Sequence, residues 1–187
     1  MKRLTRVSSL ALMLTLGFAA MTASAAMVIK MGFGDLVGNA DKIFRGTVMT
    51  SEPGTVAMGG SEFPTVVYTV RVDDALKGDF GAGKAGAVIE LTMLGNLKSE
   101  TASGSVQRLA SLDINPILEV GGEYVLFTTA PSAAGLSTTV GLGQGLFSIF
   151  NNADGRDLAT NGLNNHGMFD GPVSYEVLSA AIKAEMD

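Results

Sequence analysis

The sequence predicts a mainly β fold: an antiparallel, closed or nearly closed barrel of about five to seven strands with a C-terminal α-helix. Glycine supplies 24 of the 187 residues and is scattered between apolar runs, which is typical of a domain with many turns. Apolar and polar residues alternate in several short segments, as they do in half-buried strands. These segments follow one another without helical patterns between them. Such strands form a sheet whose edges must be covered or closed.

The N-terminus is predicted to be an export signal over residues 1–25. A basic start precedes an apolar run over residues 10–20, and the small residues Ala23 and Ala25 occupy the positions that a signal peptidase reads. The apolar run is about half as long as a membrane-spanning helix, which needs about 20 residues. We therefore expect cleavage after Ala25, an exported protein (periplasmic or extracellular) and no membrane span after cleavage.

Residues 26–187 are predicted to form one barrel domain. Its N-terminal segment, residues 26–41, contains a short helical turn over residues 34–40. Its C-terminal segment, residues 172–187, carries a helix over residues 175–186, because apolar residues recur there at helical spacing. Ser174 precedes this helix and can serve as its N-cap.

Composition excludes several classes of function. The chain has no cysteine, so it has no disulfide, no thiolate metal site and no cysteine nucleophile. Its single histidine, His166, excludes a two-histidine metal motif. Removing residues 1–25 takes away three basic residues from 13, which leaves 10 basic and 18 acidic residues and a net charge of −8. This acidic balance argues against nucleic acid as a partner.

Seven segments are predicted to be strands. The most regular one alternates Val66, Tyr68, Val70 and Val72 with polar residues. Another is apolar without a break over residues 124–127, which predicts a central strand covered on both faces. The predicted strands cover residues 42–50 (with a bend or bulge at Gly46), 65–73, 87–94, 123–129, 136–140, 145–150 and 158–160.

Between these strands, three stretches without a regular pattern are predicted to be loops, over residues 51–62, 98–106 and 130–136. Residues 151–155 (NNADG) are predicted to be a turn, because Asn, Asp and Gly accept the left-handed conformation.

The loop over residues 161–167 holds the candidate site. Asn161, Asn164, Asn165 and His166 are predicted to form a ligand or partner surface. His166 could also act alone as a general base, but no nucleophile motif accompanies it, so a polar loop residue is the favoured interpretation. No catalytic residue, cofactor or metal is predicted.

Three further motifs are interpreted structurally. Residues 151–157 lack the spacing of a calcium-binding helix–loop–helix, although the sequence leaves open whether Asp154 and Asp157 meet a metal. The glycine-rich residues 141–145 precede a predicted strand, whereas a phosphate site needs a helix N-terminus. The adjacent carboxylates of Asp73 and Asp74 are expected on opposite faces of a strand.

Four blocks carry a family resemblance: residues 35–48, residues 68–78 (Y-x-V … L-K-G), residues 122–127 (G-E-Y-V-L-F) and residues 143–147. Their order resembles an exported bacterial protein family of unknown function. It is also similar to the netrin-like barrel of tissue inhibitors of metalloproteinases, an OB-type fold, which implies a five-stranded barrel with a packed terminal helix. Those inhibitors use an N-terminal cysteine that this chain lacks, so no functional residue is carried over.

The sequence therefore favours an exported, non-enzymatic β-barrel that binds a protein or surface ligand. Two alternatives stay open. One is a protease inhibitor or a protein that acts beside an exported metalloprotease. The other is a structural component of the envelope or matrix.

Overall fold

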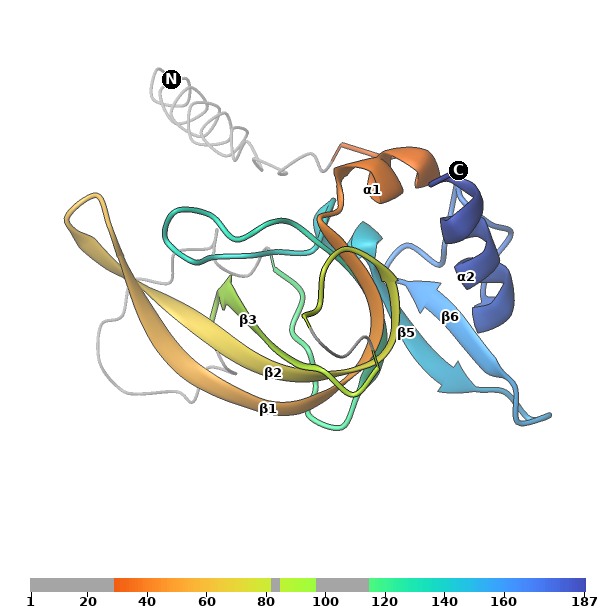
Figure 1. The fold of residues 1–187 in the computed structure, drawn as a ribbon, viewed down its shortest axis with the longest axis horizontal. Helices are drawn as coiled ribbons and strands as arrows, with labels where there is room; N and C mark the ends of the chain where they lie inside the picture. Colours follow the sequence, from red (N-terminus) through yellow and green to blue (C-terminus); the bar gives the residue numbers. More distant parts are fainter. Residues whose placement is uncertain (1–28, 82–84, 97–114) are drawn as a thin grey trace, which may run out of the picture.

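The fold is one antiparallel sheet of seven strands with two short helices, and it is described by a computed structural model over residues 29–81, 85–96 and 115–187 (Figure 1). The strands lie in the order β3-β2-β1-β4-β5-β6-β7, so two meanders, β1 to β3 and β4 to β7, meet where β4 lies beside β1. The predictions for residues 1–25 and 98–106 fall outside the described residues. The elements are α1 Phe33–Asn39, β1 Lys42–Met58, β2 Ser61–Lys77, β3 Val88–Leu94, β4 Glu123–Thr128, the 3-10 helix η2 Leu142–Gly145, β5 Leu146–Asn151, β6 Asp157–Asn161, β7 Val173–Ser174 and α2 Tyr175–Ala184.

The sheet is not closed into a barrel. Its mainly β, antiparallel character and its C-terminal helix confirm the prediction, but the edge strands β3 and β7 do not pair with each other. The reason at one edge is length, because β7 has two residues and runs directly into α2. At the other edge, the amide of Ser137 donates to the carbonyl of Thr92 at 2.9 Å, so the outer edge of β3 meets a non-strand segment there.

Strand β4 is the shared wall of two hydrophobic cores. Its residues Val125, Leu126 and Phe127 are fully buried, which confirms the central strand predicted from the unbroken apolar run. Successive side chains point to opposite faces of the sheet. Tyr124 and Leu126 therefore enter one core while Val125 and Phe127 enter the other.

The first core lies between strands β1 to β5 and the segment before β4, and the second core lies under α1 and α2. The first core comprises Phe44, Val48, Val66, Tyr68, Val70, Val72, Leu91, Met93, Leu118, Tyr124, Leu126 and Leu146. The second core comprises Leu36, Val37, Ala40, Ile43, Val125, Phe127, Val140, Phe147, Ala159, Leu178 and Ile182.

The loop predicted over residues 51–62 is instead a hairpin arm, formed by residues 50–64 at the far ends of β1 and β2. The two strands stay paired as far as Met58 and Ser61. Gly59 and Gly60 then turn the chain with φ values of +58° and +81°, which suit the tight two-residue turn of a hairpin. In Figure 1 the arm extends beyond the rest of the sheet. Within the described residues it is paired through its own two strands, except at its base, where the carbonyl of Pro64 accepts from the amide of Gly95 at 3.1 Å.

A bulge opposite Gly46 bends the sheet, as the mid-strand glycine predicted. Arg45 pairs with Asp74 and Gly46 pairs with Val72, so Asp73 is the extra residue in β2. A Cβ on Gly46 would lie 2.7 Å from the carbonyl oxygen of Arg71, which explains why a residue without a side chain stands there.

The predicted strand over residues 136–140 is wrong. Thr139 makes one isolated bridge to Thr128, and the chain then turns into η2 because the amide of Leu142 donates to the carbonyl of Thr139 at 3.0 Å. The strand was expected from its β-branched residues, and the glycines after Val140 end the pairing early.

Helix α2 begins at the predicted residue, and α1 begins one residue before the predicted start. The side chain of Ser174 accepts a hydrogen bond from the amide of Val177 at 3.3 Å, so it caps α2 as predicted. The Nζ of Lys77 donates to the carbonyl of Val37 at 2.7 Å near the end of α1, where a positive charge is favourable. Within the described residues, neither helix is long and apolar enough to cross a membrane.

Candidate functional site

The loop over residues 161–167 divides the four predicted site residues into two pairs. Asn161 and Asn165 are buried, with 5% and 0% exposure. The Oδ1 of Asn161 accepts from the amides of Leu163 and Asn165, and the Nδ2 of Asn165 donates to the carbonyls of Ala159 and Gly171. Both side-chain amides thus hold the loop together instead of facing a ligand.

Asn164 and His166 are exposed on this loop. Asn164 has a φ of +51°, which asparagine tolerates better than most residues, and this explains its place in a tight turn. The backbone amide of His166 donates to the carbonyl of Leu163 at 3.0 Å. The surface predicted from four residues therefore reduces to these two side chains.

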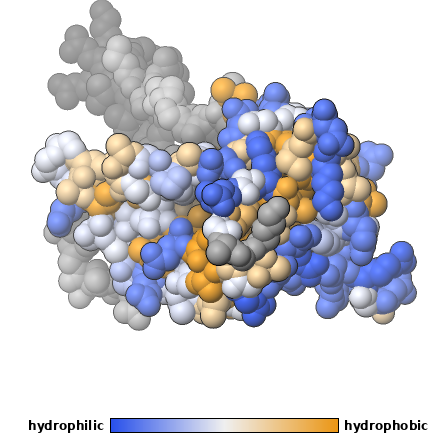
Figure 2. All heavy atoms as spheres, in the orientation of Figure 1, coloured by the Kyte–Doolittle hydropathy of each residue, from blue (hydrophilic) through white to orange (hydrophobic). Residues whose placement is uncertain are grey.

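The turn between β5 and β6 is the hairpin turn predicted for residues 151–155. The Oδ1 of Asn152 accepts from the amides of Asp154 and Arg156, which closes the turn. Asp154 pairs with Arg156 at 3.3 Å in solvent, whereas the carboxylate of Asp157 points to Arg45. Figure 2 shows hydrophilic residues over this end of the molecule, at the far right. Within the described residues, no group of three or more metal-ligating side chains gathers here or elsewhere.

The glycine-rich residues 141–145 serve close packing. A Cβ on Gly145 would contact the carbonyl oxygen of Val140, and Gly141 has a φ of +61°. Gln144, which is buried, accepts from the amide of Met31 at 2.9 Å and donates to the carbonyl of Ile29 at 3.0 Å. The segment thus fastens the chain that leads into α1.

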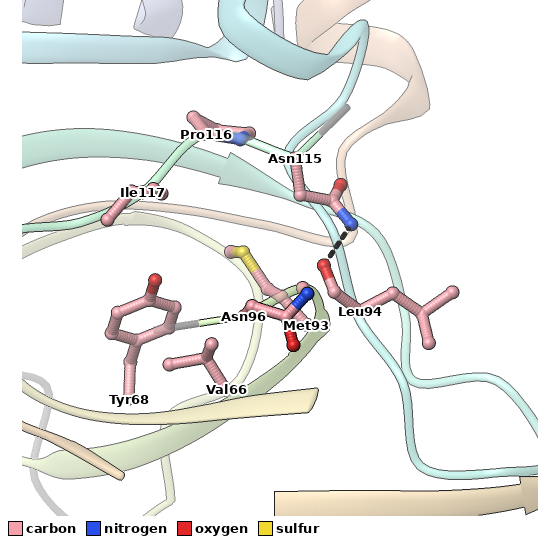
Figure 3. A pocket seen from close by; sticks show the side chains of 9 residues that line it. Val66, Tyr68, Met93, Leu94, Asn96, Asn115, Pro116 and Ile117 are labelled. Carbon is pink, nitrogen blue, oxygen red and sulfur yellow. Dashed lines mark hydrogen bonds between the residues drawn. The ribbon is translucent and has the colours of Figure 1, made fainter. Parts of the chain in front are cut away.

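A pocket of about 370 Å³ lies at one end of the first core (Figure 3). Its floor is formed by Val66 and Tyr68 of β2 and Met93 of β3, which are at most 3% exposed. Its rim is formed by residues 94–96 and residues 115–117. This volume lies within the range of small-molecule sites in proteins, about 300–1,000 Å³.

Three hydrogen bonds fix the frame of the pocket. The Nδ2 of Asn115 donates to the carbonyl of Leu94 at 2.8 Å, as the dashed line in Figure 3 shows. The amide of Leu118 donates to the hydroxyl of Tyr68 at 3.3 Å. The Oδ1 of Asn115 also accepts from the hydroxyl of Thr138 at 2.6 Å, so both ends of this amide are hydrogen-bonded within the frame. The pocket is therefore preformed.

Among the described residues, the lining of the pocket carries no charged side chain. Its polar groups are the Tyr68 hydroxyl and the amides of Asn96 and Asn115. Burial raises the pKa of the Tyr68 phenol above its usual value of 10, so the hydroxyl keeps its proton at neutral pH. These groups can bind and orient a neutral ligand.

A second polar cluster surrounds Arg45 on the opposite face of the sheet. Its Nε donates to Glu123 and a terminal nitrogen donates to Asp157, both at 2.6 Å. The hydroxyl of Tyr175 donates to Asp74 at 2.6 Å beside it. The cluster joins strands β1, β2, β4 and β6 to the first residue of α2, and its cation is satisfied within it.

The charges in this cluster explain two shifted pKa values. Burial alone would lower the pKa of Arg45, but the hydrogen bonds and charges of Glu123 and Asp157 raise it above its usual value. Burial, followed by the hydrogen bond to Asp74, raises the pKa of Tyr175. Both groups stay protonated at neutral pH, which is what a structural clamp requires.

The bulge places both Asp73 and Asp74 on the face of this cluster, so the expectation of opposite faces was wrong. Asp73 accepts from the hydroxyl of Thr47 at 2.7 Å and from the Nε of Arg71 at 2.8 Å, while Asp74 accepts from Tyr175. Each carboxylate therefore has its own partner.

Sequence reasoning missed the pocket. Tyr68 was identified as a residue of the inner strand face, which is correct, but residues 115–117 belong to a stretch without periodicity. The signal available in the sequence was the tyrosine itself, because a buried phenol needs a hydrogen-bond partner.

Comparison with known proteins adds no family to this picture: no protein-family model matches the chain, and no curated protein matches its sequence.

Proposed function

We propose that this chain is an exported, non-enzymatic binding protein that takes a neutral, largely apolar ligand group in the pocket. The observation that carries the proposal is the pocket itself, with its apolar floor, uncharged lining and volume of about 370 Å³. Export is proposed from the signal-like residues 1–25. N-terminal sequencing of the protein from the exported fraction tests it, and a first residue other than Ala26 contradicts the proposed cleavage.

The acidic net charge supports a neutral ligand group in place of an anionic one. The described residues near the pocket place no lysine or arginine in its lining, so a carboxylate or phosphate would lose its hydration without gaining a cation. An apolar group has no strong hydration to lose, and its binding gains about 25 cal/mol of free energy for each Å² of apolar surface that it buries.

Nuclear magnetic resonance of the methionine methyl groups tests the pocket. Met93 lines the floor, so a neutral apolar fragment such as cyclohexanone is expected to shift its methyl resonance, whereas cyclohexane carboxylate is expected to leave it in place. Equal shifts from both fragments, or none from either, would count against the proposal.

Two aspartate variants provide a matched pair for this titration. Ile117 lines the pocket and is 55% exposed, while Val120 is 59% exposed in the same segment and does not line it. Ile117→Asp is expected to weaken binding of the neutral fragment at least several-fold, because it places a charge at the rim. Val120→Asp is expected to bind as the unchanged protein does.

A further inference from the structure

The hydroxyl of Tyr68 has a donor to offer inside the pocket. The side chain is 2% exposed, and its oxygen accepts the hydrogen bond from the amide of Leu118. Among the described residues, no acceptor receives the proton of this hydroxyl. Figure 3 shows the hydroxyl pointing away from β2, toward the side of the pocket where Pro116 and Ile117 lie.

A buried donor without an acceptor is unfavourable, because it has given up its hydrogen bond to water and gained none in the protein. A ligand that supplies an acceptor at this point removes that cost. The raised pKa of the phenol keeps the proton in place for such a bond over the whole neutral range. Asn115 already uses both ends of its amide, and Asn96 is exposed at the rim, so the donor that the floor offers is the phenol.

We propose that the pocket takes an apolar group that carries a carbonyl oxygen, and that the Tyr68 hydroxyl donates a hydrogen bond to this oxygen. This inference rests on the proposed function, because it assigns the ligand chemistry of the same pocket. The carbonyl can belong to a small ketone or ester, or to the backbone of a peptide whose apolar side chain fills the pocket.

Two probes of nearly equal shape test the hydrogen bond: cyclohexanone, which has a carbonyl oxygen, and methylenecyclohexane, which has a CH₂ group in its place. Both are titrated against the unchanged protein and Tyr68→Phe. The ketone is expected to bind Tyr68→Phe about 3- to 10-fold more weakly, the range of one net hydrogen bond. The hydrocarbon is expected to bind both proteins alike.

The outcomes separate this inference from the function on which it rests. If both probes bind the unchanged protein and Tyr68→Phe binds each of them just as tightly, the pocket stands and the hydrogen bond is refuted. If neither probe binds the unchanged protein, the proposed function fails and the inference fails with it. If Tyr68→Phe weakens the binding of both probes equally, the variant has distorted the pocket, because it removes the acceptor of the Leu118 amide. The second measurement then decides.

A second measurement does not depend on the folding of that variant. When cyclohexanone is bound to the unchanged protein, its carbonyl stretch is expected to lie below its frequency in an apolar solvent, because a hydrogen bond lowers that frequency. With Ile117→Asp, which weakens binding, the stretch is expected to stay at its aqueous position. A carbonyl that shows an apolar environment on the unchanged protein overturns the inference. N-acetyl-leucine methylamide is the peptide arm, and tighter binding of this probe than of cyclohexanone identifies a peptide as the source of the carbonyl.

Discussion

The guanidinium of Arg45 lies over the ring of Tyr175, with 4.6 Å between its central carbon and the ring centre. This contact joins the start of β1 to the first residue of the C-terminal helix. The same guanidinium holds Glu123 of β4 and Asp157 of β6, so a single side chain connects four elements. Its environment therefore provides the first test of what stabilises the fold.

Arg45→Met is expected to lower the free energy of unfolding by about 2 kcal/mol. The change leaves the carboxylates of Glu123 and Asp157 without a cation. Loss of one partner from a fully buried pair costs about 3–5 kcal/mol. These carboxylates are about one-third exposed, so solvent screening reduces the cost. Denaturant unfolding measures it. Arg156→Met is the control, since the Arg156–Asp154 pair is about 70% exposed and should contribute less than about 0.5 kcal/mol. Equal losses from the two changes would contradict the assignment.

The hydrogen bond from Tyr175 to Asp74 is expected to stabilise the fold up to about pH 10 and to fail above it. Folding raises the pKa of this phenol, so the stabilising protonated form is fully present below the ordinary value of about 10 and is lost as pH rises further. Tyr175→Phe is expected to cost about 1.5 kcal/mol at neutral pH. The difference in unfolding free energy between the two proteins should shrink in the alkaline range. A constant difference would show that the bond does not control the titration.

Gly46→Ala is expected to destabilise the protein by about 2 kcal/mol or more. The new methyl group would meet the carbonyl oxygen of Arg71 at 2.7 Å and the Cγ1 of Val70 at 2.8 Å, inside a packed sheet. Gly38→Ala is the matched control, because a Cβ there meets nothing within 4 Å. Its position in α1 predicts a gain of about 0.5–1 kcal/mol. Thermal unfolding of both variants checks the two signs, and a stable Gly46→Ala would refute the close approach.

Asn165→Gly is expected to lower the free energy of unfolding by about 2–3 kcal/mol. It keeps the left-handed backbone, φ +58°, but removes hydrogen bonds with Asn161, Ala159 and Gly171 from a fully buried site. The same change at the exposed Asn164, φ +51°, should alter stability by less than about 0.5 kcal/mol. Similar effects at both positions would contradict the division of this loop into a buried scaffold and an exposed pair.

Gly60→Ala is expected to loosen the hairpin arm without affecting the cores. A left-handed φ of +81° costs an L-residue about 1–2 kcal/mol, which corresponds to at least about 5-fold faster amide exchange in residues 54–64. Exchange in β4 should not change. Gly59→Asn is the control, since asparagine is accepted at this place in a two-residue turn. Faster exchange throughout the sheet would show that the arm and the cores open together.

Alternation in the sequence identified the inner face of β2 and the doubly covered β4, because burial imposes a two-residue period on strands. It could not identify the arm. The alternation is interrupted there by Pro53, Gly54 and Pro64. The pairing of the two strands depends on the turn at Gly59 and Gly60, which sets the register between them.

The sequence predicted a bend or bulge at Gly46, but it could not assign the extra residue to Asp73 of the partner strand, and it did not show the pocket. A bulge shifts one residue between faces and is fixed by the partner strand, so Asp73 and Asp74 look like ordinary neighbours in the chain. Part of the rim of the pocket comes from residues 115–117, whose position depends on hydrogen bonds to Tyr68 and Leu94, far away in sequence. The Asn161–Asn165 loop was found from its composition, which does not distinguish inward from outward amides.

Because β4 lines both interiors, neither can be completed until most of the polypeptide is available. The last residues that enter the second core are Leu178 and Ile182 of α2. A shorter N-terminal fragment would leave Val125 and Phe127 uncovered on one side. We therefore expect the first core to need the chain only as far as Leu146, whereas the second core closes only when α2 docks.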